Sequence, residues 1–135
     1  MFAAQQGHAD IARLLIGNGA RLEETDTEGN TALIYASLHG HPDVAEALID
    51  SGADVNVISA NSISPLIAAA GDGHADIVRL LVEKGADLNY KMHGKTALVL
   101  AAGLGKIECV RLLAAQDGAE LKQAADWARR QREMR

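Results

Sequence analysis

The sequence predicts an all-α solenoid in which copies of one helix–turn–helix unit stack side by side. A Gly-Ala pair recurs every 33 residues, beginning at Gly19, Gly52, Gly85 and Gly118. A second motif keeps step with it: Thr-Ala-Leu from Thr31, Ser-Pro-Leu from Ser64 and Thr-Ala-Leu from Thr96. Apolar residues between the motifs follow helical spacing. A period of roughly 20 to 50 residues is typical of solenoids, whose units bury their apolar faces against their neighbours.

The second helix of each unit is encoded in three near copies. They are GHADIARLLIGNGAR from Gly7, GHPDVAEALIDSGAD from Gly40 and GHADIVRLLVEKGAD from Gly73, with a looser fourth copy from Gly105. The apolar residues of the third copy are Ile77, Val78, Leu80, Leu81 and Val82, which form one wide helical face. The glycine of each Gly-Ala pair ends the helix, because glycine tolerates the left-handed conformation of a C-terminal cap.

The first helix of each unit begins after a hydroxyl residue. Thr31, Ser64 and Thr96 can each accept a hydrogen bond from a free N–H group of the first helical turn. Pro65 follows at the first helical position, where its missing N–H costs little. Small residues on this helix face its neighbour: Ala36 and Ser37, Ala69 and Ala70, Ala101 and Ala102. Between units, residues 26–29 (Asp-Thr-Glu-Gly) fit a type I turn, which we interpret as a projecting finger.

Composition agrees with a single stacked domain. The chain has 135 residues, of which 48% are apolar and only 3% aromatic, so its core consists mainly of Leu, Ile, Val and Ala. The single cysteine allows no internal disulfide. The net charge of −5 argues against a nucleic-acid partner, because phosphate binding needs a basic surface.

These motifs resemble the ankyrin-repeat family over residues 2–120. The resemblance implies one domain with four units and finger loops, or short β-hairpins, between them. The predicted units are 1–25, 26–58, 59–91 and 92–120, followed by a C-terminal capping helix over 121–135, in which Trp127 packs on the fourth unit. A targeting signal in the Arg-rich end of that helix is the alternative that we disfavour.

The chain departs from the family pattern at three places. Ile34, Ile67 and Val99 replace a histidine that links repeats in the family, so we expect apolar packing instead. In the third finger, residues 57–63 lack the Asp and Gly of the turn and are unusually apolar. In the fourth finger, residues 90–95 are one residue short.

No constellation of catalytic residues is evident. His8, His41 and His74 each precede an Asp by two residues, which suggests metal ligands or acid–base pairs. They recur at the repeat period, however, so they stand about 10 Å apart in parallel rows. We interpret them as histidines that bond backbone between units. Cys109 aligns with Ile77 and is predicted to be a buried apolar residue. The sequence therefore predicts no catalytic residue, no metal site and no cofactor.

The resemblance implies that a partner meets the finger tips and the exposed faces of the first helices. Mapped residue by residue, the expected partner-binding surface consists of Gln5, Gln6, Thr27, Glu28, Asn30, Leu38, His39, Ala60, Asn61, Ile63, Gly71, Asp72, Met92, His93, Lys95, Gly103 and Leu104. Leu38, Ile63, Met92 and Leu104 could form the apolar centre of an interface. Alternatively, Ile63 and Met92 pack between adjacent fingers. Asn56 and Asn89 occupy a position that is hydroxylated in some family members, but we favour side chains that bond the loop backbone.

The predicted function is that of a non-catalytic protein–protein interaction module: an adaptor, a scaffold or a stoichiometric inhibitor. The alternative is a regulatory or targeting ankyrin domain of a larger enzyme or channel, because the sequence starts inside a unit. A metal-binding or small-molecule enzyme is disfavoured. The expected partner is another protein, with no nucleic acid and no membrane insertion. We expect an intracellular monomer. The cytoplasm is the expected compartment, and the nucleus is the alternative that the sequence leaves open.

Overall fold

The computed structural model describes residues 8–17, 19 and 21–116. Gln5, Gln6, Trp127 and the predicted capping helix over 121–135 lie outside these residues. The division into four units and a cap therefore remains a prediction.

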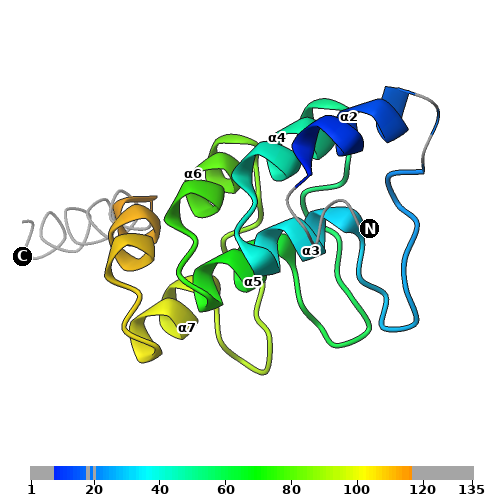
Figure 1. Cartoon of the computed structure of the whole chain (residues 1–135). Coiled ribbons are helices and arrows are strands. Elements are labelled where there is room, and N and C mark those ends of the chain that lie inside the picture. The colour runs from blue at the N-terminus through cyan, green and yellow to red at the C-terminus, as the bar shows by residue number, and fades with distance from the viewer. Residues whose placement is uncertain (1–7, 18, 20, 117–135) are drawn as a thin grey trace, which may run out of the picture.

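The helices form two rows (Figure 1). The outer row contains α2 (Ala9–Gly17), α4 (Pro42–Asp50) and α6 (Ala75–Glu83), and the inner row contains α3 (Ala32–His39), α5 (Pro65–Gly71) and α7 (Ala97–Gly103). Residues 107–116 form a further helix after α7. Helix α3 packs on α4 of its own unit and on α5 of the next, and the same pattern continues along the stack. The predicted all-α solenoid is confirmed. Within the described residues, no helix is both long and apolar enough to cross a bilayer.

The predicted caps start the inner helices. The hydroxyl oxygens of Thr31, Ser64 and Thr96 accept hydrogen bonds from the N–H groups three residues later, at 3.3, 3.1 and 3.3 Å. Each satisfies one of the N–H groups that a helix start leaves without an intrahelical partner. The same hydroxyl residue thus stands at the end of the finger and caps the start of the inner helix.

The core lies between the two rows. Small residues bring the inner helices close together, and Ala36, Ala69, Ala70 and Ala101 are fully buried. Ser37 is also buried, and its hydroxyl donates to the Leu33 carbonyl at 2.8 Å, so no unsatisfied polar atom results. Both rows contribute larger side chains: Leu33 and Ile34 of α3, and Val44, Ile77, Val78 and Leu81 of the outer helices, are buried.

Three apolar residues are exposed because they lie at the ends of the described stack. Ile34 and Ile67 are buried as expected, but Val99 is 53% exposed and Ala102 is also exposed. No described helix packs on α7 from the side opposite α5, so the expected apolar packing of Val99 is wrong in this unit. Leu14 is 65% exposed for the corresponding reason, because no described outer helix precedes α2.

A pair of leucine truncations tests this account of the core. Leu81 is fully buried between units, so Leu81→Ala should lower the free energy of unfolding by about 3 kcal/mol. Leu14→Ala removes the same atoms from an exposed position and should cost less than about 0.5 kcal/mol. Urea unfolding followed by circular dichroism measures both, and equal losses would contradict the assigned packing.

Candidate partner-binding surface

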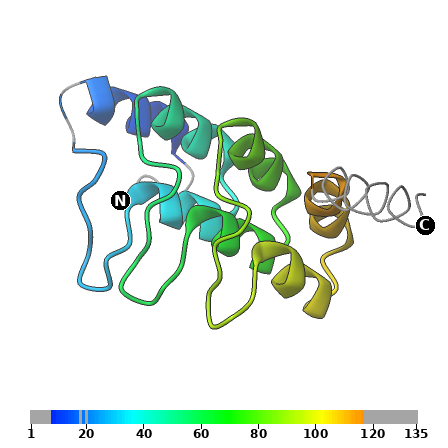
Figure 2. The same cartoon turned by 180° about the vertical axis from the view of Figure 1, so that it is seen from behind.

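Three loops project from the stack side by side, each leading from an outer helix to the next inner helix (Figures 1 and 2). We define equivalent segments of these loops as the second finger (residues 22–30), the third finger (55–63) and the fourth finger (88–95). They carry many of the predicted partner-binding residues. The second and third fingers close through the same turn with different residues, and the fourth finger uses another turn.

The second finger closes as the predicted turn. The Gly29 N–H donates to the Asp26 carbonyl at 3.0 Å, as in a β-turn with Asp first and Gly fourth. Asp26 Oδ1 accepts the N–H groups of Glu28 and Asn30, both at 2.9 Å, and Tyr35 donates its hydroxyl to Asp26 Oδ2. The Tyr35 hydroxyl is the main cause that lowers the pKa of the Asp26 carboxyl below 3.8, and the same bond raises the Tyr35 pKa above 10.0.

The third finger keeps this turn without Asp or Gly. Ser59 stands 33 residues after Asp26, and its hydroxyl accepts the N–H groups of Asn61 and Ile63 at 3.2 and 3.1 Å. Ser62 stands where the second finger has Gly29 and adopts a left-handed backbone with φ of 66°. A serine hydroxyl can thus replace a carboxylate as the acceptor of the turn, a substitution that the sequence analysis missed.

The fourth finger, which is one residue short, uses a different turn. Met92 and Lys95 face each other through two backbone hydrogen bonds of 2.9 and 3.0 Å. His93 and Gly94, between them, have φ of 52° and 79°. Two central residues with positive φ characterise the type I′ hairpin, which matches the twist of its flanking strands. The deletion therefore shortens the loop to a two-residue hairpin.

The tips of the fingers are bonded to one another. The Ala60 N–H of the third finger donates to the Glu28 carbonyl of the second at 2.9 Å. The Tyr90 hydroxyl, at the base of the fourth finger, donates to the Ser62 carbonyl of the third at 2.6 Å. The fingers consequently form one linked row, in which bonds between neighbouring fingers hold the backbone of each loop beside the next.

A second series of bonds links the finger bases. Glu23 Oε1 accepts the Asp54 N–H at 2.9 Å, and 33 residues later Asn56 Oδ1 accepts the Asp87 N–H at 2.7 Å. The predicted role of Asn56 as a side chain that bonds loop backbone is confirmed. The Asn89 N–H donates to Asp87 Oδ1 at 2.9 Å, as the Asn56 N–H does to Asp54.

Most of the predicted partner-binding residues within the described part of the chain reach solvent. The exposed ones are Thr27, Glu28, His39, Ala60, Asn61, Asp72, His93, Lys95, Gly103 and Leu104. Leu38, Ile63, Gly71 and Met92 are half-buried. Met92 packs against the core of the stack, and the alternative that Ile63 and Met92 pack between adjacent fingers stays a prediction. Leu104, at 55% exposure, is the most open of the four apolar candidates.

Asn30 requires a correction, because it is only 4% exposed. Its amide nitrogen turns back to the acidic finger, 3.5 Å from Asp26 Oδ2 and 3.4 Å from Glu28 Oε2. Its Oδ1 is buried and has no hydrogen-bond partner among the described residues. Asn30 thus supports the finger and does not belong to the free surface.

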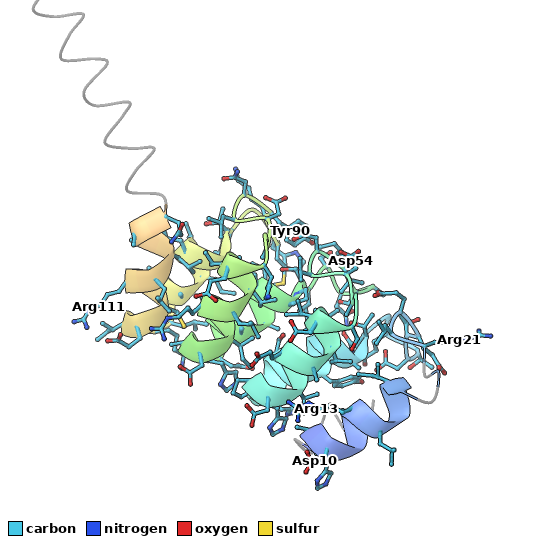
Figure 3. The ribbon with its side chains drawn as sticks, turned by 90° about the horizontal axis from the view of Figure 1, so that it is seen from above. Asp10, Arg13, Arg21, Asp54, Tyr90 and Arg111 are labelled. Carbon is cyan, nitrogen blue, oxygen red and sulfur yellow. The ribbon has the colours of Figure 1, made fainter. Side chains whose placement is uncertain are left out.

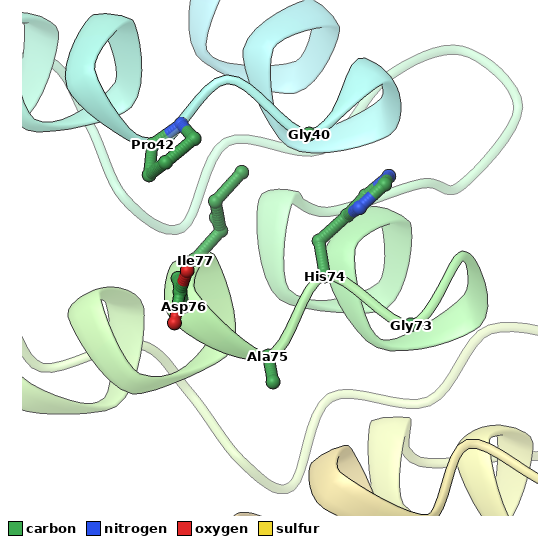
Figure 4. A pocket seen from close by; sticks show the side chains of 7 residues that line it. All are labelled: Gly40, Pro42, Gly73, His74, Ala75, Asp76 and Ile77. Carbon is green, nitrogen blue, oxygen red and sulfur yellow. The ribbon is translucent and has the colours of Figure 1, made fainter.

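A hollow of about 310 Å³ lies between neighbouring units, next to the start of α6 (Figure 4). The His74 ring beside it has its Nε2 3.0 Å from the Leu38 carbonyl oxygen of the preceding unit. Gly40 makes room for the ring, since an added Cβ there would lie 2.6 Å from it. This confirms the interpretation of His74 as a link between units. Among the described residues, no group of three or more His, Cys, Asp or Glu side chains could hold a metal ion.

Cys109 has the environment that its alignment with Ile77 predicts. It is 1% exposed, and burial raises the pKa of its thiol above 9.0. A buried, protonated thiol is a poor nucleophile. The prediction of a buried apolar residue is confirmed.

The bond between Tyr35 and Asp26 predicts a pH dependence. Because the folded-state pKa of Asp26 is lowered, this bond stabilises the protein above the ordinary carboxyl pKa, and the stabilisation is lost as the pH falls through the folded-state value. Tyr35→Phe should raise the pKa of Asp26 toward 3.8, which NMR titration measures. The variant should be less stable than the original protein at neutral pH, and this difference in the free energy of unfolding should become smaller below pH 3.8. Tyr90→Phe is the control. The Tyr90 hydroxyl donates to a backbone carbonyl, which does not titrate, so the stability that this variant loses should not change in acid.

The contact between the second and third fingers can be tested at Gly29. Gly29 and Gly85 both have positive φ, 77° and 88°, so alanine strains either backbone by about 1 kcal/mol or more. A Cβ at Gly29 would also lie 2.8 Å from the Ala60 nitrogen, whereas one at Gly85 would meet nothing within 4 Å. Gly29→Ala should therefore lower the free energy of unfolding by about 1 kcal/mol more than Gly85→Ala. Equal values in thermal unfolding would disprove the contact.

Comparison with known proteins agrees with this geometry. The family model "Ankyrin repeats (3 copies)" matches residues 1–59 and 58–125. A search of curated proteins found no match. Ankyrin repeats are generally protein–protein interaction modules and are typically non-catalytic. Since the two matches span most of the sequence, the chain belongs to the ankyrin-repeat family.

Proposed function

We propose that this chain is a non-catalytic module that binds a partner protein through its finger tips and the exposed faces of α3, α5 and α7. It acts as an adaptor, a scaffold or a stoichiometric inhibitor. The observation that carries the proposal is the linked row of fingers, which presents Thr27, Ala60 and His93 to solvent while bonds to neighbouring fingers and helices fix the backbone. A preorganised backbone loses little conformational entropy when a partner binds.

The apolar centre of the proposed interface consists of Leu38, Ile63 and Leu104. Leu38 and Ile63 are half-buried, and Leu104 is 55% exposed. Next to Leu38, the rings of Tyr35 and His39 stack with their centroids 6.2 Å apart, which adds a flat surface to the inner-helix face. Apolar side chains surrounded by polar ones are typical of protein interfaces.

The proposal extends to the setting of the module. We expect it to work as a monomer inside the cell, in cytoplasm or nucleus, on a protein and not on a nucleic acid. The net charge of −5 and the buried cysteine support these expectations. If the module regulates or targets a larger enzyme or channel, the same surface would bind another part of that protein.

Affinity capture from cell extract, with the bound proteins identified by mass spectrometry, tests this function. Leu38→Asp/Ile63→Asp should reduce capture of the specific partner by at least about tenfold, because it places two charges in the apolar centre. Leu104→Asp serves as a second variant at a more exposed position. Ser51→Asp/Gln116→Asp, at the exposed C-cap of α4 and at an exposed position of helix 107–116, adds the same charge elsewhere and should not affect capture.

Circular dichroism melting selects the variants that remain folded. Equal capture by the folded surface variants and the outer-helix control would rule out the proposed surface.

A further inference from the structure

The three fingers differ systematically in charge. The second finger (22–30) carries Glu23, Glu24, Asp26 and Glu28 and no basic residue. The third finger (55–63) carries no ionisable side chain. The fourth finger (88–95) carries Lys91, Lys95 and His93 and no acidic residue. Charge therefore changes from negative through neutral to positive along the row.

The spatial order of the fingers follows this order in the sequence. The fingers stand side by side with the third in the middle (Figures 1 and 2). Packed helices of adjacent units lie about 10 Å apart, which puts the two outer fingers about 20 Å from each other. This separation exceeds the Debye length of about 8 Å at physiological ionic strength, so each end attracts a ligand charge independently.

The charges at both ends are available to a ligand. Glu24, Glu28, Lys91 and Lys95 are exposed, and the salt bridges found among the described residues involve no finger residue. Three of the acidic side chains also have partners within the chain. Asp26 accepts the Tyr35 hydroxyl and the turn N–H groups, Glu23 accepts the Asp54 N–H, and Glu28 Oε2 lies 3.4 Å from the Asn30 amide nitrogen.

Charged residues just before the fingers reduce the difference in net charge between the fingers but do not reverse its sign. Those positions hold Arg21, Asp54 and Asp87. Arg21 points outward beyond the end of the stack (Figure 3). The carboxylates of Asp54 and Asp87 each accept a backbone N–H of their own loop.

The middle of the row is uncharged and partly apolar, with Asn56 and Asn61 exposed beside its apolar side chains. Ile58 is 43% exposed, Ala60 is exposed and Ile63 is half-buried. Residues 55–71 contain no ionisable side chain at all. The next charge along the chain is Asp72, which caps the end of α5 opposite to the third finger.

We propose that the finger row binds a peptide segment of three blocks: basic residues against the second finger, a short apolar stretch against the third and acidic residues against the fourth. An extended chain advances about 3.3 Å per residue, so about six residues bridge the outer fingers. Uniformly charged ligands are disfavoured, because a polyanion is repelled by the second finger and a polycation by the fourth. This inference rests on the proposed function and specifies the partner's chemistry.

Synthetic peptides test the proposal directly. The first has about four lysines, four apolar residues and four glutamates in blocks, long enough to reach beyond both outer fingers. The second has the same composition with the charges interleaved, and two more carry only lysines or only glutamates at both ends. In fluorescence anisotropy, the block peptide should bind about tenfold more tightly than the interleaved one, and added salt should weaken it.

Charge reversal in the fingers should change the preference in a defined direction. Lys91→Glu/Lys95→Glu makes both ends acidic, so the variant should favour the lysine-only peptide. Glu24→Lys/Glu28→Lys should favour the glutamate-only peptide in the same way. Arg79→Glu/Arg111→Glu makes the same change of charge as the first variant on exposed positions of outer helices and should retain the preference for the block peptide.

The outcomes separate this inference from the proposed function. Equal binding of block and interleaved peptides, or no binding of the block peptide at low salt, would overturn the inference. So would folded charge-reversal variants that keep the original preference. If these variants still capture the cellular partner while Leu38→Asp/Ile63→Asp does not, the binding surface stands and only its charge selectivity is wrong. If neither affects capture, the surface itself is wrong.

Discussion

The structure depends on contact between units that cannot be stable alone. A pair of short helices has too little apolar surface to offset the conformational entropy of folding, so each unit must share its buried faces with its neighbours. Small residues such as Ala36 and Ala69 bring the inner helices together, and larger ones such as Val78 and Leu81 fill the space behind them. The exposure of Val99 and Leu14 follows from the same rule, since each has no described neighbour on one side.

The link from this scaffold to a binding surface is the backbone of the fingers. Most of the apolar burial and helix capping is done by residues outside the finger tips, although Ser59 is buried and Met92 packs against the core. The tips nevertheless have fixed positions, because Glu28 bonds to Ala60, and Tyr90 bonds to Ser62, across the gaps between loops. Rigid loops on a rigid stack provide a recognition surface whose chemistry can differ from finger to finger, and in this chain it does so in charge.

Much of the fold could be predicted from the sequence, because the repeat turns local patterns into spatial ones. The hydroxyl caps, the buried columns of the outer helices and the link made by His74 all follow from spacing. Less of the surface could be predicted. The burial of Asn30 depends on a side-chain rotation toward Asp26 and Glu28, and periodicity does not determine rotamers. To predict the turn in the third finger, one must recognise that the Ser59 hydroxyl can accept the same N–H groups as the Asp26 carboxylate. To predict the hairpin in the fourth finger, one must infer from the one-residue deletion that the type of turn changes.

Three unrelated tip sequences, closed by Asp26 and Gly29, by Ser59 and Ser62, and by His93 and Gly94, arrive at the same row. The interface is therefore modular: its specificity is encoded in finger segments whose closing turns differ while the helical columns stay the same. New binding preferences can arise by replacement of one loop at a time, including changes of loop length, while the buried columns remain unchanged. In such a scaffold, selection for stability acts mainly on the helices and selection for recognition mainly on the loops.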